Sequence, residues 1–179
     1  MAHVKRSDFL LAVQSRVARI AVGPSTVRGR GNAGTVAAAR QFLRQVDLTE
    51  FGVRPEAFRR ALDRETQALC VVLPRGARRW GIARKLLNIF LRDCLYTTYL
   101  ASAYNLVRAE AALEVPLDSI TAQSLKRLGA RGALPRWPGV KYVDVAISAR
   151  FQEAAKVEAT RARVARVHLD AVWWSRDRD

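Results

Sequence analysis

Apolar residues recur at helical spacing along most of this chain, and they almost never alternate with polar residues as they do in a half-buried strand. The first such run consists of Phe9, Leu10, Val13, Val17 and Ile20. With 179 residues, the chain is long enough for one domain with its own core or for two small helical lobes around a cleft. We therefore predict an all-α fold and a single domain over 1–179. The expected helices cover about 8–20, 35–46, 55–71, 82–104 and 119–128, with one or two more between 147 and 174.

Charge is the second constraint, because 31 Lys and Arg residues face only 16 Asp and Glu residues, for a net charge of +15. Charge of one sign repels itself in a compact state, and a polyanionic partner explains such an excess best. We expect this partner to be nucleic acid. The competing interpretations are a basic protein that is merely soluble and one that contacts anionic membrane surfaces. Only five of the 31 are lysines, so each lysine, which unlike arginine can form a Schiff base, is a candidate for chemistry.

Several classes of site are excluded by residue type and spacing. His3 and His168 are isolated, and Cys70 and Cys94 form no C-x-x-C pair, so we predict neither a metal site nor a cofactor. No apolar stretch approaches the roughly 18 residues of a membrane span, and residues 14–16 interrupt the N-terminal apolar run before it could act as a signal peptide. We expect a cytoplasmic protein, with no membrane and no obligate protein partner.

The segment LPRGARRWGIARKLLN, residues 73–88, has the pattern of a turn between two helices. Glycines let a backbone approach another molecule closely, and a helix N-terminus directs unpaired N–H groups at a phosphate. Arginines surround such an anion site with positive charge. We therefore predict a helix–hairpin–helix over about 60–95. Its expected DNA-contacting residues are Arg75, Gly76, Arg78, Arg79, Gly81 and Arg84. The alternative is an ordinary interhelical turn with solvated arginines.

Lys85 follows this turn and shares a helix face with Ile82, Leu86 and Ile89. A lysine on an apolar stripe loses hydration, and this favours the neutral amine that acts as a nucleophile. The competing interpretation is a lysine at the edge of the stripe whose ammonium reaches water.

Asp118 follows a short apolar run and a proline, and it precedes the helix expected over 119–128. An Asp in this position is most often an N-cap. The functional interpretation is a carboxylate held rigidly at a helix start, where it could deprotonate Lys85 or a water and stabilise positive charge on a sugar.

Together these segments resemble the helix–hairpin–helix DNA glycosylase superfamily, whose members carry a hairpin of the LPGVGRKTA type followed by a VPVDTHV-type segment. GIARKLLN, residues 81–88, matches the first from its last glycine onward, and VPLDSIT, residues 115–121, matches the second. The resemblance implies that Lys85 and Asp118 are the catalytic pair. Their separation of 33 residues is similar to that in the archaeal 8-oxoguanine glycosylase branch. The chain departs from the pattern in its longer, more basic hairpin and in Ser119–Ile120, where the family often has Thr-His.

The Arg-rich hairpin, LPRWPGVKY (134–142) and ARVHLDAVWW (165–174) are similar to bacterial anti-phage glycosylases, which remove glucosylated hydroxymethylcytosine from phage DNA. This resemblance implies a protein of the bacterial cytosol or nucleoid that acts on double-stranded DNA with a modified base and leaves abasic sites. One alternative is an 8-oxoguanine DNA glycosylase/lyase of base excision repair. The other is a non-catalytic helix–hairpin–helix DNA-binding module.

Two mechanisms remain open for the pair. Lys85 could attack C1′ while Asp118 takes its proton, which leads to a Schiff base and possible strand cleavage. Alternatively, Asp118 could activate water while Lys85 contributes only charge.

Residues outside the two motifs could complete the site. An indole stacks on a flipped base or a sugar ring, so Trp173 and Trp174 are candidates for the base pocket, together with Asn32. Arg28 and Arg30, in the Gly-rich basic loop 23–34, are candidates for DNA contacts. The alternatives are tryptophans that close the core and a loop that is a mobile basic connector.

Overall fold

The computed structural model describes residues 5–27, 34–129 and 132–176, and every regular element within these ranges is a helix. The α-helices are α1 (Arg6–Ala21), α2 (Thr35–Leu43), α3 (Pro55–Val72), α4 (Trp80–Tyr96), α5 (Thr98–Ala103), α6 (Ser119–Leu128), α7 (Val145–Ala162) and α8 (Leu169–Arg176). Short 3₁₀ helices connect them: η1 (Leu48–Glu50), η2 (Arg75–Ala77), η3 (Leu106–Ala109), η4 (Val140–Tyr142) and η5 (Arg166–His168). The prediction of an all-α protein is confirmed. In the described ranges, no helix is both long and apolar enough to cross a membrane.

One of the predicted helices is broken in the structure, and the one or two helices expected near the C-terminus are two. The helix expected over 82–104 is divided into α4 and α5 at Thr97, whose backbone is extended. The backbone N–H of Thr97 donates to the carbonyl of Cys94, and its hydroxyl donates to the carbonyl of Asp93 at 2.8 Å. The C-terminal region forms α7 and α8, and α7 ends at Arg163 in the left-handed conformation with φ 56°.

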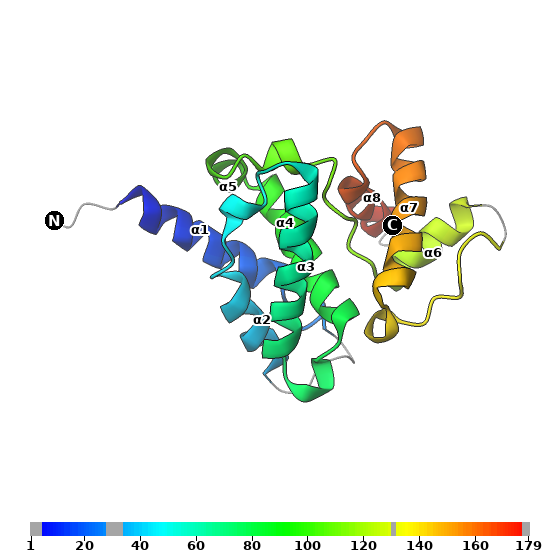
Figure 1. The fold of residues 1–179 in the computed structure, drawn as a ribbon, viewed down its shortest axis with the longest axis horizontal. Helices are drawn as coiled ribbons and strands as arrows, with labels where there is room; N and C mark the ends of the chain where they lie inside the picture. The colour runs from blue at the N-terminus through cyan, green and yellow to red at the C-terminus, as the bar shows by residue number, and fades with distance from the viewer. Residues whose placement is uncertain (1–4, 28–33, 130–131, 177–179) are drawn as a thin grey trace.

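The buried apolar side chains form two clusters. The first cluster is built mainly by α1 to α5 and η3, and it includes Leu43, Phe58 and Phe90. The second cluster is built by residues 115–125, α7 and α8. Figure 1 shows α1 to α5 on the left of the molecule and α6 to α8 on the right. Trp137 packs against both clusters, so the segment before η4 joins the two halves.

The start of α4 is held in place by close backbone packing against η4. A Cβ atom added to Gly81 would lie 2.1 Å from the carbonyl oxygen of Val140 and 2.8 Å from that of Val143. No real Cβ tolerates these distances, so only glycine allows this approach. The contact links a residue of the hairpin to a loop about 60 residues later and sets the position of α4 relative to the C-terminal helices.

Candidate active site

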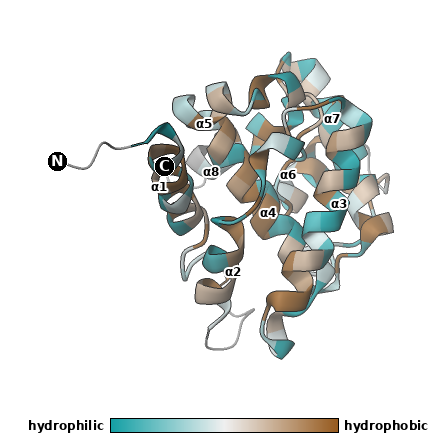
Figure 2. Cartoon of the chain, turned by 60° about the vertical axis from the view of Figure 1, so that its left-hand side comes forward, coloured by the Kyte–Doolittle hydropathy of each residue, from teal (hydrophilic) through white to brown (hydrophobic). Residues whose placement is uncertain are grey.

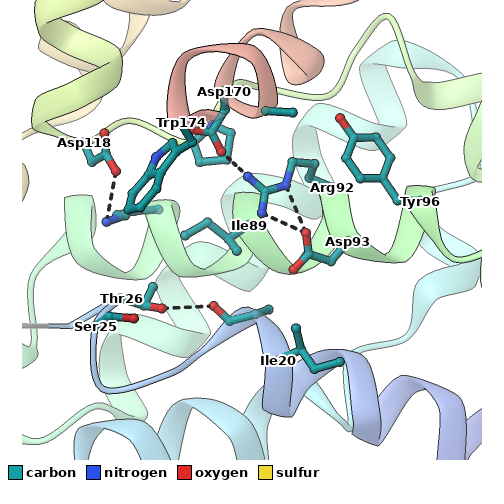
Figure 3. A pocket seen from close by; sticks show the side chains of 14 residues that line it. Ile20, Ser25, Thr26, Ile89, Arg92, Asp93, Tyr96, Asp118, Asp170 and Trp174 are labelled. Atoms are coloured by element: carbon teal, nitrogen blue, oxygen red, sulfur yellow. Dashed lines mark hydrogen bonds and ion pairs between the residues drawn. The ribbon is translucent and has the colours of Figure 1, made fainter. Parts of the chain in front are cut away.

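One face of α4 lines a pocket of about 700 Å³ (Figure 3). The α4 residues in its wall are Lys85, Ile89, Arg92, Asp93 and Tyr96. Their spacing of four, three, one and three residues places them on one side of the helix. The C-terminal end of α1, the loop that follows it, the segment before α6, and α8 complete the wall. A charged stripe on a largely buried helix is therefore explained by the pocket that it faces.

Lys85 and Asp118, which are 33 residues apart in sequence, meet in this pocket. Lys85 Nζ lies 3.5 Å from Asp118 Oδ2, and the two side chains are only 9 % and 8 % exposed. Each charge is shielded from bulk water, so their attraction is stronger than that of a surface pair. The structure thus brings together the two residues that the sequence predicted as a pair.

The two carboxylate oxygens of Asp118 have different partners. Oδ1 accepts a hydrogen bond from the backbone N–H of Thr121 at 3.0 Å, which makes Asp118 the N-cap of α6. Oδ2 faces Lys85. The capping bond fixes the side chain, because one oxygen is anchored to a helix terminus while the other points at the ammonium. The two interpretations of Asp118, as a cap and as a functional carboxylate, are therefore compatible.

Asp170 adds a second buried carboxylate, and it comes from α8 at the other end of the sequence. It forms an ion pair with Arg92, and its Oδ1 accepts a 3.5 Å hydrogen bond from the Thr121 hydroxyl. Burial raises the pKa of Asp170 to about 6. Arg92 opposes this rise, the charge of Asp118 adds to it, and Lys85 again opposes it.

Arg92 lies between two carboxylates on the pocket wall. Its Nε and Nη2 donate to Asp93 Oδ1 at 3.0 and 2.8 Å, and its Nη1 pairs with Asp170. Burial raises the pKa of Asp93, against the opposing effect of Arg92. Near it, the Tyr96 hydroxyl is 2.8 Å from His168 Nδ1, and this histidine is 2.5 Å from Glu110 through Nε2. The wall beside Lys85 thus offers several oriented donors and acceptors to a polar ligand.

In this pocket, the amine of Lys85 and the carboxylate of Asp118 are held next to each other and largely away from solvent. Such a pair can exchange a proton, and it can stabilise a positive charge that develops in the pocket. Within the described residues, no group of three or more His, Cys, Asp or Glu side chains is arranged to hold a metal ion.

The prediction that Arg84 contacts DNA conflicts with its position. Arg84 is 7 % exposed, and its Nε and Nη2 pair with both oxygens of Glu114 at 2.9 and 3.0 Å. Its Nη1 donates to Asp63 at 2.8 Å and to Thr66 at 3.0 Å. Burial alone would raise the pKa of Glu114, but Arg84, Asn88 and Arg166 together outweigh that effect, and the pKa lies below its ordinary value. Arg84 is a structural residue because its guanidinium is already matched with carboxylates inside the protein.

Gly81 is a second correction, because its missing side chain serves the contact with η4 rather than an approach to DNA. The other four hairpin residues, Arg75, Gly76, Arg78 and Arg79, are exposed between α3 and α4. They remain accessible to a phosphate backbone. Arg78 also donates to the carbonyl of Leu73 at 3.3 Å, which holds its side chain against the turn.

The two tryptophans proposed for the pocket occupy different environments. Trp173 is 7 % exposed and packs in the second cluster, so it is a core residue, and the prediction that it lines the pocket is wrong. Trp174 lines the pocket and is 39 % exposed. Figure 3 shows Trp174 and Asp170 on the same helix above α4. Arg28, Arg30 and Asn32 lie outside the described residues.

Sequence reasoning missed Arg92, Asp93 and Asp170. The first two could have been found, because their spacing from Lys85 by seven and eight residues places them on the same helix face. Nothing in the sequence around Asp170 indicates that α8 folds back over α4.

None of the protein-family models, curated proteins and solved structures with which the chain was compared matches it.

Proposed function

We propose that this protein is a DNA glycosylase that flips a modified base out of duplex DNA and excises it. The observation that carries the proposal is the buried Lys85–Asp118 pair, 3.5 Å apart in the wall of the large pocket. A net charge of +15 supports a DNA partner. A helix–hairpin–helix formed by α3, residues 73–79 and α4 would bind the backbone through Arg75, Arg78 and Arg79, which are exposed.

The proposed fold is that of the helix–hairpin–helix glycosylases, with two lobes around a cleft. The two apolar clusters would be the cores of these lobes. Residues from the first half, such as Lys85 and Ile20, and from the second half, such as Asp118 and Asp170, share the pocket wall, as expected of a site between lobes.

In the proposed reaction, Lys85 transfers a proton to Asp118, and its neutral amine attacks C1′ of the flipped nucleotide. The bond between C1′ and the base breaks, and its electron pair leaves with the base, which takes up the proton held by Asp118. Asp118 is then a carboxylate again and stabilises the positive charge on the sugar and on the newly bonded amine. The alternative is that Asp118 deprotonates a water that attacks C1′, while Lys85 remains an ammonium. The position of Lys85 supports the first version, because its amine lies in the pocket wall and faces at 3.5 Å a carboxylate that can take its proton.

The substrate that we propose is glucosylated hydroxymethylcytosine of phage DNA, removed in anti-phage defence. A pocket of about 700 Å³ has room for a base that carries a hexose. The carboxylates of Asp93 and Asp170, the guanidinium of Arg92 and the hydroxyl of Tyr96 are groups that bind sugar hydroxyls. The indole of Trp174 offers a stacking surface.

The first experiment compares base release by Lys85→Gln and Asp118→Asn with two matched controls. Lys126→Gln removes an exposed lysine of α6, and Asp144→Asn changes the N-cap of α7, which accepts from Ile147 N–H as Asp118 does from Thr121. Asn also caps helices, so both Asp variants keep their helix starts. We expect the site variants to lose base release by about 10²-fold or more, while DNA affinity changes little and the controls retain activity. Full activity of both site variants would refute the assignment.

Three duplexes identify the substrate: one with glucosylated hydroxymethylcytosine, one with 8-oxoguanine and one with normal bases only. Alkaline cleavage then reports abasic sites. We expect release from the glucosylated duplex alone; release of 8-oxoguanine alone would make the protein a repair enzyme. Tight binding without release from any duplex would indicate a non-catalytic module. Borohydride trapping decides the nucleophile, because only attack by Lys85 gives a covalent adduct with DNA.

A further inference from the structure

A second hollow, of about 570 Å³, lies between α1 and α2 and is lined by four arginines; we call it the arginine groove. Arg16 and Arg19 come from α1, Arg40 comes from α2, and Arg44 directly follows α2 as its C-cap. None of the described residues that line it is acidic. Among the described ion pairs, none involves any of these four arginines. The hollow therefore concentrates positive charge without an internal counter-charge.

The groove is shaped by residue size and by one anchored arginine. Ala12, Ser15 and Ala37 are small, so the space between the two helices is left open. Arg40 is held by the end of α1, because its Nε donates to the carbonyl of Val22 at 2.7 Å and its Nη2 to that of Arg19 at 2.9 Å. These bonds satisfy carbonyls at a helix C-terminus and fix the guanidinium at the groove.

The groove is adjacent to both parts of the proposed DNA site. On α1, Arg19 is followed directly by Ile20, which lines the active-site pocket. At the start of α2, a Cβ atom added to Gly34 would lie 4.0 Å from Pro74 Cγ in the hairpin turn. Figure 2 shows α1 and α2 next to each other at one side of the molecule. The arginine groove thus shares α1 with the active-site pocket, and α2, which forms its other side, begins next to the hairpin turn.

We propose that this groove binds the phosphodiester backbone of duplex DNA next to the flipped nucleotide. Guanidinium groups in one hollow repel each other, and a row of phosphates removes that repulsion while Arg16, Arg19 and Arg44 form paired hydrogen bonds with it. The inference rests on the proposed function only for the identity of the polyanion. It adds a contact surface that is independent of the Lys85–Asp118 chemistry.

The test measures binding of an unmodified duplex by the triple variant Arg16→Ala, Arg19→Ala, Arg44→Ala between about 50 and about 200 mM salt. Arg40 is left intact because its side chain bonds the end of α1. Loss of three phosphate contacts should make the slope of log affinity against log salt shallower by about 2 to 3 units. The triple Lys variant should keep most of the wild-type slope, since it keeps the charge. That rescue separates loss of charge from misfolding.

The matched control removes three exposed arginines from other elements, Arg59 and Arg60 of α3 and Arg108 of η3. We expect this control to change the slope by less than about 1 unit. If the groove Ala variant and this control change the slope equally, the proposal is overturned, because net charge alone would then explain binding. A groove variant that loses affinity for single-stranded RNA but not for duplex DNA would also overturn it. This assay does not depend on base excision. The groove proposal can therefore fail while the glycosylase proposal stands, and the glycosylase proposal can fail while the groove proposal stands.

Discussion

The buried carboxylate of Asp170 makes the stability of this protein depend on pH in a way that one substitution can isolate. Asp170 is 3 % exposed, and its pKa rises from 3.8 to about 6 in the folded protein. This difference corresponds to about 3 kcal/mol, because one pKa unit is about 1.36 kcal/mol. Asp170→Asn keeps the shape of the side chain and a hydrogen-bond acceptor for Arg92, but it removes the ionisation.

The direction of the pH dependence follows from which state binds the proton of Asp170 more tightly. The folded state binds it more tightly, because the pKa of Asp170 is higher in the folded than in the unfolded protein. The contribution of Asp170 to stability is therefore complete below pH 3.8 and is lost as the pH rises through about 6. Of this contribution of about 3 kcal/mol to the free energy of unfolding, about 1.4 kcal/mol is lost between about pH 5 and about pH 7.5. Relative to the wild type, Asp170→Asn should thus gain about 1.4 kcal/mol in free energy of unfolding over that interval.

The assay is urea unfolding followed by circular dichroism at the two pH values, with the wild type and the variant measured together. Other titrating groups are common to both proteins and cancel in the difference. Asp8→Asn, at an exposed carboxylate in the first turn of α1, controls for the loss of a negative charge. If the difference between Asp170→Asn and wild type is the same at both pH values, burial does not raise the pKa of Asp170 and the reasoning fails.

Four further substitutions test where the structure places Gly81, Arg84, Trp173 and Trp174. Gly81→Ala should lower the free energy of unfolding by about 3 kcal/mol or more, because its Cβ would lie 2.1 Å from a carbonyl oxygen of η4; thermal unfolding measures this. Arg84→Ala leaves Glu114 buried without its main partner, and we expect a loss of about 3–5 kcal/mol in urea unfolding with an unchanged salt dependence of DNA binding. Trp173→Ala should lose about 3–5 kcal/mol. Trp174→Ala should instead weaken base release and alter stability by less than about 1 kcal/mol, and a reversal of these two outcomes would contradict their placement.

Much of the fold could be predicted from local patterns. Helical spacing of apolar residues predicted the elements, and Pro55 at the start of α3 and Asp118 at the cap of α6 marked two boundaries correctly. These signals are readable because they act within one or two turns of the chain. The break at Thr97 was missed because apolar spacing continues through it, and the extended backbone of this residue is seen only in the structure.

The sequence by itself determined that the chain is helical and strongly basic and that it contains a candidate Lys–Asp pair. The tertiary structure decided which charged residues face the pocket. Arg84 and Lys85 are neighbours in sequence, yet one is matched with Glu114 in the interior and the other lies opposite Asp118 in the pocket. Adjacent positions on a helix point about 100° apart, so packing against different partners gives them different roles. Asp170 joins the site only because α8 packs beside α6, through contacts between residues far apart in sequence that no local pattern encodes.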